Sequence, residues 1–374
     1  MSRPFHGGNL KEATSRYKIA GDKIIDFSAN INPLGLSLRV KEALSNSIET
    51  ALRYPDPYCE GLKKEIAAHL EVDDRNILVG NGSCNLIYLI PQVLTPRRVL
   101  IPLPAFSEYE YSVKINQGTC EFLSLEETTR FCLKPESVVE NLKDIDAVFI
   151  CNPHNPTGRV MVKEALLFLI SECEKENVGV VVDEAFVDFA EDYDNLTLVK
   201  EAVLRKSLLV LRSLTKFFGL PGLRVGYLVG ERRLIDRISL KQPPWMVNAL
   251  GQSAAREALK DQEYIEETRK FIRQERDYLF SELQRLDGIE PYPSEANFIF
   301  CRLTHERMDS TLLTDELGRQ GILIRDCSTF RGLDRKFIRL AVRRREENVT
   351  LISALGKIFR SSSASSGLVP QESR

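Results

Sequence analysis

The residues with the clearest chemical potential lie in the run SLTKFFGLPGLRVGY, from Ser213 to Tyr227. The run follows a predicted strand and places Lys216 between hydroxyl residues and Arg224, with glycines that permit a tight backbone. A lysine that forms a Schiff base needs a pocket that lowers its pKa, and a phosphate site needs hydroxyl donors and a fixed cation. The run therefore predicts an amine nucleophile beside a phosphate site. Alone, such a run more often places a lysine in an exposed loop.

Two further motifs favour the chemical interpretation. The sequence NPHNPTG at residues 152–158 follows one predicted strand, and DEAF at residues 183–186 ends another. The order NPTG, then DEA, then SxTK together with RxGY resembles the fold type I pyridoxal 5′-phosphate (PLP) enzymes of the aspartate-aminotransferase superfamily. One motif is only a hypothesis, but three in order at suitable spacings are specific. The resemblance implies that Lys216 is the catalytic residue and holds PLP as a Schiff base.

The same resemblance implies roles for the residues around the cofactor ring. Asp183 would pair with the pyridinium nitrogen and keep it protonated, so that the ring can accept electrons. Asn155 would hydrogen-bond the phenolic oxygen of the ring. Tyr109 matches the aromatic residue that stacks on the ring.

A cofactor phosphate site is also implied. Ser213 and Arg224 would bind the phosphate, together with backbone amides of Gly82, Ser83 and Cys84. These amides stand where a predicted helix begins, and the free N–H groups and dipole of a helix start favour an anion.

Tyr54, in the run Arg53-Tyr54-Pro55, points to a second copy of the chain. It matches a tyrosine that reaches the cofactor phosphate of the neighbouring subunit. The resemblance thus implies a homodimer with shared active sites. The alternative is an ordinary exposed aromatic residue on a surface turn.

Within the superfamily, the chain is most similar to the threonine-phosphate decarboxylases of cobalamin biosynthesis, and the histidinol-phosphate aminotransferases are the nearest alternative. The matching pieces are HGGN at 6–9, DFSANINPLG at 26–35, PWMVN at 244–248, and the pair Arg325 and Arg339. Phe186 stands where aminotransferases usually have a tyrosine, which removes a hydroxyl donor. His154 stands where an asparagine is common. The implied reaction converts L-threonine O-3-phosphate to (R)-1-amino-2-propanol O-2-phosphate. A second candidate reaction converts L-serine O-phosphate to ethanolamine phosphate.

The choice of reaction depends on how the substrate is held. The bond at Cα that breaks is the one perpendicular to the cofactor ring, so a decarboxylase must turn the carboxylate out of the ring plane. We expect Arg325 and Arg339, with Asn32 and His6, to bind mainly the substrate phosphate and leave the carboxylate free. Arginine suits this task because its planar fork donates two hydrogen bonds to one oxyanion. The alternative is that the arginines are surface charges at a strand edge.

The elements that must position these residues alternate between apolar runs and amphipathic stretches. Strands are predicted at 76–80, 98–102, 147–151, 178–183, 207–212, 296–301, 322–325 and 337–342. This alternation predicts an α/β protein with a mainly parallel sheet flanked by helices. The resemblance implies the PLP-dependent transferase fold type I, with a seven-stranded sheet in the large domain and a smaller α/β C-terminal domain. Ligands bind beyond the carboxyl ends of such strands, where the motifs lie.

The expected organisation has four parts. Residues 1–40 form an N-terminal arm that contributes to the active site and small domain, and 41–243 form the large PLP-binding domain. A bridging helix and the small domain occupy 244–360, with a closing helix at 348–359. The serine-rich tail at 361–374 lacks an apolar face and is predicted to be disordered.

Composition excludes several other classes of protein. The 51 Lys+Arg and 53 Asp+Glu leave a net charge of −2, so neither nucleic acid nor a membrane surface is expected as a partner. No apolar run approaches the ~20 residues that span a bilayer, and no signal-peptide core is seen, which predicts a cytoplasmic protein. The eight cysteines lack metal-site spacing and are expected to be reduced, with no bound metal. A PLP-binding regulator would need a DNA-binding module for which the chain has no room.

Overall fold

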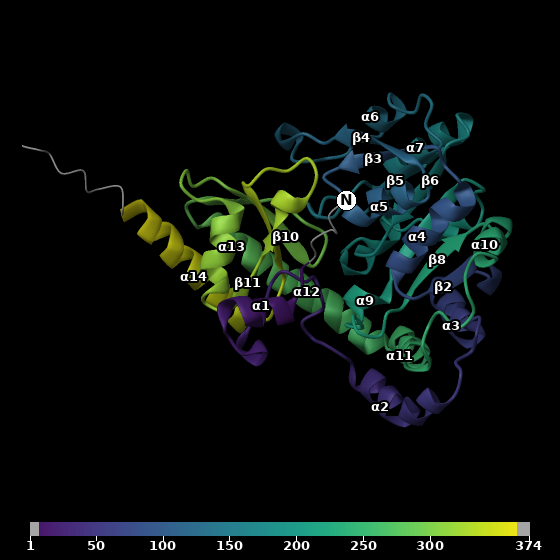
Figure 1. The fold of residues 1–374 in the computed structure, drawn as a ribbon, viewed down its shortest axis with the longest axis horizontal. Coiled ribbons are helices and arrows are strands. Elements are labelled where there is room, and N and C mark those ends of the chain that lie inside the picture. Colours follow the sequence, from purple (N-terminus) through teal and green to yellow (C-terminus); the bar gives the residue numbers. More distant parts are fainter. Residues whose placement is uncertain (1–6, 365–374) are drawn as a thin grey trace, which may run out of the picture.

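The computed structural model describes residues 7–364, with side chains to Ser361. Figure 1 shows a large sheet covered by helices and, beside it, a smaller group of strands and helices. The long helix α12 (Gln262–Gln284) lies between the two groups. We call the seven-stranded sheet with its covering helices the large domain, and the second group, with α1, α13 and α14, the small domain. The predicted domain boundaries at residues 40, 243 and 360 stay predictions.

The sheet of the large domain is mainly parallel and seven-stranded, as predicted. Its strand order is β2-β8-β7-β6-β5-β3-β4, and β8 runs antiparallel to both of its neighbours. The strands are β2 (Ile77–Gly80), β3 (Arg98–Leu103), β4 (Thr119–Ser124), β5 (Ala147–Cys151), β6 (Gly179–Asp183), β7 (Leu208–Ser213) and β8 (Gly226–Gly230). The strands β4 and β8 were not among those predicted by residue number.

Helices on both faces bury the strands, which explains the unbroken apolar runs. Val148 and Val180 enter one core cluster, whereas their neighbours Phe149 and Val181 enter the cluster on the opposite face. The helices of this domain are α2 (Leu38–Ser47), α3 (Glu60–Leu70), α4 (Ser83–Leu94), α5 (Ser107–Ile115), α6 (Pro135–Val139), α7 (Lys163–Lys175), α8 (Val199–Ala202), α9 (Leu214–Phe217), α10 (Arg232–Ser239) and α11 (Ala249–Lys260).

The small domain contains a four-stranded sheet with the order β12-β13-β10-β9 and a separate parallel pair, β1 and β11. Its strands are β1 (Ile25–Asp26), β9 (Ile289–Pro291), β10 (Phe298–Leu303), β11 (Ile322–Leu323), β12 (Arg325–Asp326) and β13 (Phe337–Ala341). Its helices are α1 (Leu10–Tyr17), α13 (Ser310–Gly318) and α14 (Arg345–Ala364). The strand β1 comes from the start of the chain, so this domain is assembled from both ends of the sequence.

Three predicted boundaries need correction. The single strand predicted at 322–325 is divided into β11 and β12, which belong to different sheets. The helical stretch after Pro244 forms two helices, because the side chain of Asp261 accepts a hydrogen bond from the Tyr264 N–H and starts α12 anew. The closing helix α14 continues to Ala364, so residues 361–364 of the predicted tail are helical; 365–374 lie outside the described residues.

None of the helices that the structure describes is long and apolar enough to cross a membrane.

Candidate active site

A pocket lies at the carboxyl ends of the parallel strands and extends to the small domain. It encloses about 240 Å³. Cys151, Asp183 and Ser213 are the last residues of β5, β6 and β7, and all three line it. Parallel strands end at the same edge of a sheet, which explains why residues far apart in the sequence meet here.

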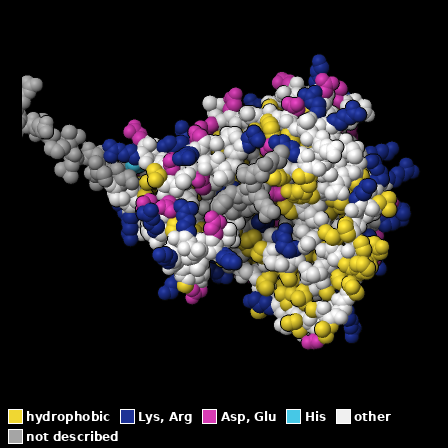
Figure 2. Space-filling model, in the orientation of Figure 1, with side chains coloured by type: hydrophobic (Ala, Val, Ile, Leu, Met, Phe, Trp, Pro, Cys, Tyr) yellow, Lys and Arg dark blue, Asp and Glu magenta, His cyan; other side chains and the backbone are white. Residues whose placement is uncertain are grey.

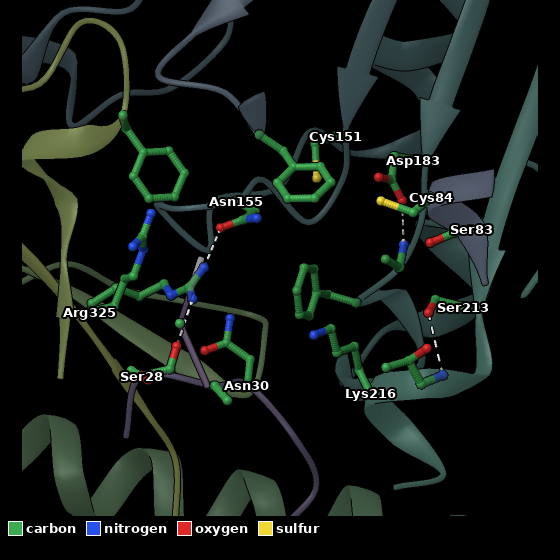
Figure 3. A pocket seen from close by; sticks show the side chains of 18 of the residues that line it. Ser28, Asn30, Ser83, Cys84, Cys151, Asn155, Asp183, Ser213, Lys216 and Arg325 are labelled. Atoms are coloured by element: carbon green, nitrogen blue, oxygen red, sulfur yellow. Dashed lines mark hydrogen bonds between the residues drawn. The ribbon is translucent and has the colours of Figure 1, made fainter. Parts of the chain in front are cut away.

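Lys216 lies in the short helix α9, directly after β7, and its side chain points into the pocket (Figure 3). The Ser213 hydroxyl starts this helix by accepting a hydrogen bond from the Thr215 N–H at 3.3 Å. Burial, with the nearby guanidinium groups of Arg339 and Arg224, lowers the pKa of Lys216 to about 8. A larger fraction of the amine is therefore uncharged and nucleophilic near neutral pH than for an exposed lysine.

Asp183 presents its carboxylate to the same pocket. It accepts hydrogen bonds from the Tyr109 hydroxyl at 2.6 Å and the Ala185 N–H at 3.0 Å. Burial raises the pKa of Asp183, while these two hydrogen bonds oppose the rise. The carboxylate is thus held in one orientation in a low-dielectric wall.

Tyr109 does not occupy the position predicted for it. It is fully buried behind Asp183, stacked on Phe149 with ring centroids 5.4 Å apart, and does not line the pocket. The aromatic residue that lines the pocket is Phe106, which packs edge-on against Tyr109. The hydroxyl of Tyr109 explains this exchange, because buried in the wall it can bond to Asp183. Tyr109 supports Asp183, and Phe106 faces the cavity.

The start of α4 and Arg224 form a tight cradle on one side of the pocket. Gly82 has a φ of 77°, and a Cβ added to it would lie 2.5 Å from Arg224 Nη2. A Cβ on Gly226 would lie 2.4 Å from the Ser83 nitrogen. These glycines therefore allow Arg224 and β8 to approach the helix start, whose first N–H groups have no partner within the helix. Ser83, Cys84, Ser213 and Arg224 all line this side.

Two arginines of the small domain face the cradle across the pocket (Figure 3 labels one of them, Arg325). Arg325 and Arg339 are directly paired residues of β12 and β13. Arg339 donates hydrogen bonds to Asn155 Oδ1 and, at 3.2 Å, to the Ser28 carbonyl oxygen, while its buried Nε has no partner among the described residues. Burial lowers the pKa of Arg339 to about 10, and the adjacent Arg325 contributes to this shift.

This pair of cations is suited to an anion. Arg325 donates to the Thr329 hydroxyl at 2.8 Å and lies over the Phe330 ring, with 5.1 Å between the guanidinium carbon and the ring centroid. Within the described part of the chain, no carboxylate forms an ion pair with Arg339. Both arginines are buried, which contradicts the surface-charge alternative.

Asn32, predicted to contact the substrate, is occupied elsewhere. Its amide nitrogen donates to the Phe217 carbonyl at 2.8 Å and to the hydroxyls of Tyr264 and Thr268, both at 3.0 Å, and the residue does not line the pocket. Asn30 lines it instead, and its buried Oδ1 has no partner among the described residues. Both asparagines belong to the DFSANINP run. The motif therefore indicates the right segment, but only the fold shows which asparagine faces the pocket.

His6 lies outside the described residues, although Gly7, which follows it, lines the pocket. Tyr54 is 84% exposed and packs against Trp245 at 5.1 Å between ring centroids, away from the pocket of its own chain.

His154 has a clear local role. Its Nδ1 lies 2.7 Å from the Thr157 hydroxyl, and its ring also hydrogen-bonds the Pro104 carbonyl. Burial lowers the pKa of His154 to about 4, so the ring is neutral at physiological pH. It therefore ties the loop that carries Asn155 to the loop that leads to Phe106.

The chain is similar to proteins of known family. The model of the family "Aminotransferase class I and II" matches residues 22–355. The chain belongs to this family. The threonine-phosphate decarboxylase of Salmonella typhimurium is 37% identical over 359 residues, which cover 95% of this chain and 96% of that protein.

The solved structures that are similar to this chain include an aminotransferase and a decarboxylase with the two candidate activities. The histidinol-phosphate aminotransferase of Clostridium acetobutylicum is 33% identical, with a TM-score of 0.84 over 90% of this chain and 99% of that one. The L-threonine-O-3-phosphate decarboxylase of Porphyromonas gingivalis is 29% identical, with a TM-score of 0.79 over 89% of this chain and 99% of that one. The fold is thus shared by both.

Proposed function

We propose that this chain binds PLP in the pocket and decarboxylates L-threonine O-3-phosphate to (R)-1-amino-2-propanol O-2-phosphate. The observation that carries the proposal is that Lys216, with its lowered pKa, and two buried arginines face each other across one cavity (Figure 3). The near full-length similarity to a threonine-phosphate decarboxylase supports the same substrate. L-Serine O-phosphate differs from it by one methyl group and is a candidate second substrate.

The residues present fit PLP. The cradle at the start of α4, with Ser213 and Arg224, offers amides, hydroxyls and a cation to a phosphate. Asp183 offers a carboxylate to a ring nitrogen, Asn155 offers an amide to a ring oxygen, and Lys216 lines the same cavity. When bound, PLP supplies a conjugated ring that takes up the electrons of a breaking bond at Cα. Phe106 would cover one face of that ring, in the place predicted for Tyr109.

Arg325 and Arg339 would hold the substrate phosphate. The Nε of Arg339 is a buried donor with no partner in the part of the chain that the structure describes. Leaving such a donor unsatisfied is costly, so a ligand oxygen at this position is strongly favoured. Asn30 Oδ1 is a buried acceptor in the same wall and would receive a hydrogen bond from a substrate N–H or O–H. With the phosphate anchored there, the carboxylate is free to turn out of the ring plane and leave.

Lys216 would then return a proton to Cα through its Nζ. A pKa of about 8 leaves most of the amine protonated at pH 7 and still able to release its proton. An aminotransferase would use the same nitrogen to remove the Cα proton. The pocket therefore supports either reaction in principle, and the position of the carboxylate decides between them.

A direct assay tests the reaction. Purified protein with PLP is expected to release CO₂ from L-threonine O-3-phosphate and to form the amine phosphate in equal amount. Little transfer of an amino group from histidinol phosphate to 2-oxoglutarate is expected under the same conditions. The matched control is L-threonine without phosphate, which offers no anion to the two arginines. Transfer from histidinol phosphate without any CO₂ release from either phospho-amino acid would refute the decarboxylase proposal and leave the PLP site intact.

We also propose that the active unit is a homodimer. Figure 2 shows hydrophobic side chains gathered over the part of the large domain where α2, α3 and α11 lie. Exposed apolar side chains in these segments and the adjoining turns are Leu38, Ile48, Leu52, Tyr54, Tyr58 and Trp245. A contiguous apolar area of this kind favours burial against a second copy. Tyr54 would then reach the cofactor phosphate of the other subunit.

Mixing two inactive variants tests this arrangement. Tyr54→Ala and Lys216→Ala chains are expected to regain activity when mixed, because one of the two sites in a mixed dimer receives both wild-type residues. At full random exchange, a quarter of all sites would be wild type in this respect. Mixing Tyr54→Ala chains that also carry Lys216→Ala with Lys216→Ala chains is the control and should remain inactive. Verified subunit exchange without recovery would contradict shared sites.

A further inference from the structure

A pair of charged side chains joins the two domains beside the pocket. Arg331 of the small domain donates to both carboxylate oxygens of Glu110 in α5, from Nε to Oε2 at 3.1 Å and from Nη2 to Oε1 at 2.9 Å. The same guanidinium lies over the Phe122 ring of β4, with 4.7 Å between its carbon and the ring centroid. A two-point contact with a carboxylate fixes orientation as well as distance.

Each partner adjoins residues that line the pocket. Arg331 directly follows Phe330, which lies over Arg325, and Thr329 in the same loop accepts the hydrogen bond from Arg325. The next residue, Gly332, has a φ of 87°, and a Cβ added to it would lie 3.3 Å from the Leu103 Cβ of β3. The loop from Cys327 to Leu333 is therefore held closely against the large domain.

Glu110 belongs to α5, the helix that begins at the pocket. Phe106 is the N-cap residue of α5 and lines the cavity, and Tyr109 in its first turn donates to Asp183. Glu110 also pairs with Lys114 one turn later. A short series of contacts thus connects Arg325, which would bind the substrate phosphate, with Asp183, whose carboxylate would face the cofactor ring.

We infer that Arg331 and Glu110 form an interdomain latch that holds the loop from Cys327 to Leu333 against α5 and thereby positions Arg325 and Phe330 over the pocket. Arg331 and Glu110 are positioning residues, since neither lines the cavity. The inference rests on the proposed function only in taking this pocket as the substrate site.

The latch is only partly shielded from solvent. The Arg331 side chain is 53% exposed and that of Glu110 is 17% exposed, so water and salt screen the pair. Burial works against the charge of Glu110, but hydrogen bonds from Lys114 and Arg331 outweigh it and lower the pKa of Glu110. The carboxylate therefore stays ionised across the neutral range, and ionic strength rather than pH should control the latch.

Hydrogen–deuterium exchange of the PLP-loaded protein tests the latch without relying on activity. In Glu110→Gln and Arg331→Gln, peptides covering 325–333 and 104–114 are expected to exchange about threefold to fivefold faster than in wild type, the scale of an exposed ion pair. The effect of the double variant should be smaller than the two single effects combined, because each single change already breaks the Arg331–Glu110 contact. Arg319→Gln, which removes an ion pair with Asp315 inside the small domain, is the control and should change neither peptide.

Kinetics give the second measurement. In both single variants, KM for L-threonine O-3-phosphate is expected to rise about threefold to fivefold while kcat changes less than twofold. Added salt should raise KM more in wild type than in the variants, because only the wild type has the latch to lose. Unchanged exchange in both peptides, or effects that simply add in the double variant, would overturn the latch. Faster exchange in a protein that releases no CO₂ would keep the latch and refute the proposed substrate.

Discussion

Replacing Lys216 with alanine is expected to abolish decarboxylation, with a loss of at least about 10²–10⁴-fold, because the residue supplies both the amine and the proton. Borohydride reduction of wild-type protein loaded with PLP should fix a pyridoxyl group on the peptide that contains Lys216. The variant should carry none. Lys357→Ala, an exposed change in α14, is the matched control and should behave as wild type.

The labelling of Lys216 is also expected to depend on pH. Burial and two nearby arginines lower the pKa of Lys216 to about 8, so the uncharged amine becomes the main form as pH rises through about 8. Incorporation of PLP into cofactor-free protein should therefore rise through that pH and level off above it. An exposed lysine would show the rise more than two pH units higher. Labelling recovered on any other lysine would contradict the assignment.

Removal of Arg339 is expected to produce the second large effect. Arg339→Ala should weaken binding of the phosphorylated substrate by about 2–5 kcal/mol, because the substrate anion would lose a buried cationic partner. The expected result is a large rise in KM. Arg339→Lys should recover only part of the loss, since an ammonium group cannot reproduce the two-point donation of a guanidinium.

Two controls distinguish phosphate binding by Arg339 from a purely structural role of this residue. Arg335→Ala removes an exposed arginine shortly before β13 and should leave KM unchanged. L-Threonine without phosphate should be bound equally poorly by wild type and Arg339→Ala, because the lost interaction involves the phosphate. If KM for the phosphorylated substrate is unchanged in Arg339→Ala, the phosphate site must lie elsewhere in the pocket.

The fold could be predicted where strands are long and buried on both faces. Residues 147–151 were predicted as a strand and form β5, whose five residues are all buried. The edge strand β4 was not predicted, because it is half-exposed and contains Glu121. The strand β8 was not predicted, because its first residues belong to the run from Ser213 to Tyr227 that predicted a phosphate site. Strands β1 and β12 have two residues each, too few for any periodic pattern to detect.

Site residues could be predicted where a motif fixes both the residue and the end of a strand. Lys216, Asp183, Asn155 and Arg224 meet in one pocket because their motifs follow neighbouring strands. Side-chain direction at a helix start could not be predicted, which is why Phe106 and not Tyr109 faces the cavity. The roles of these residues, the dimer and the cytoplasmic location stay predictions.

The parallel pairing of β1 with β11 has a consequence for biosynthesis. Ile25 and Asp26 leave the ribosome early, but their partners, Ile322 and Leu323, emerge almost 300 residues later. Large domains fold during synthesis in the order in which they emerge, so the seven-stranded sheet can be complete while the start of the chain still lacks its partner. Arg325 and Arg339 emerge in the same late segment. A nascent chain that stops before β11 would therefore contain Lys216 and the phosphate cradle, yet it would have no means of holding the substrate.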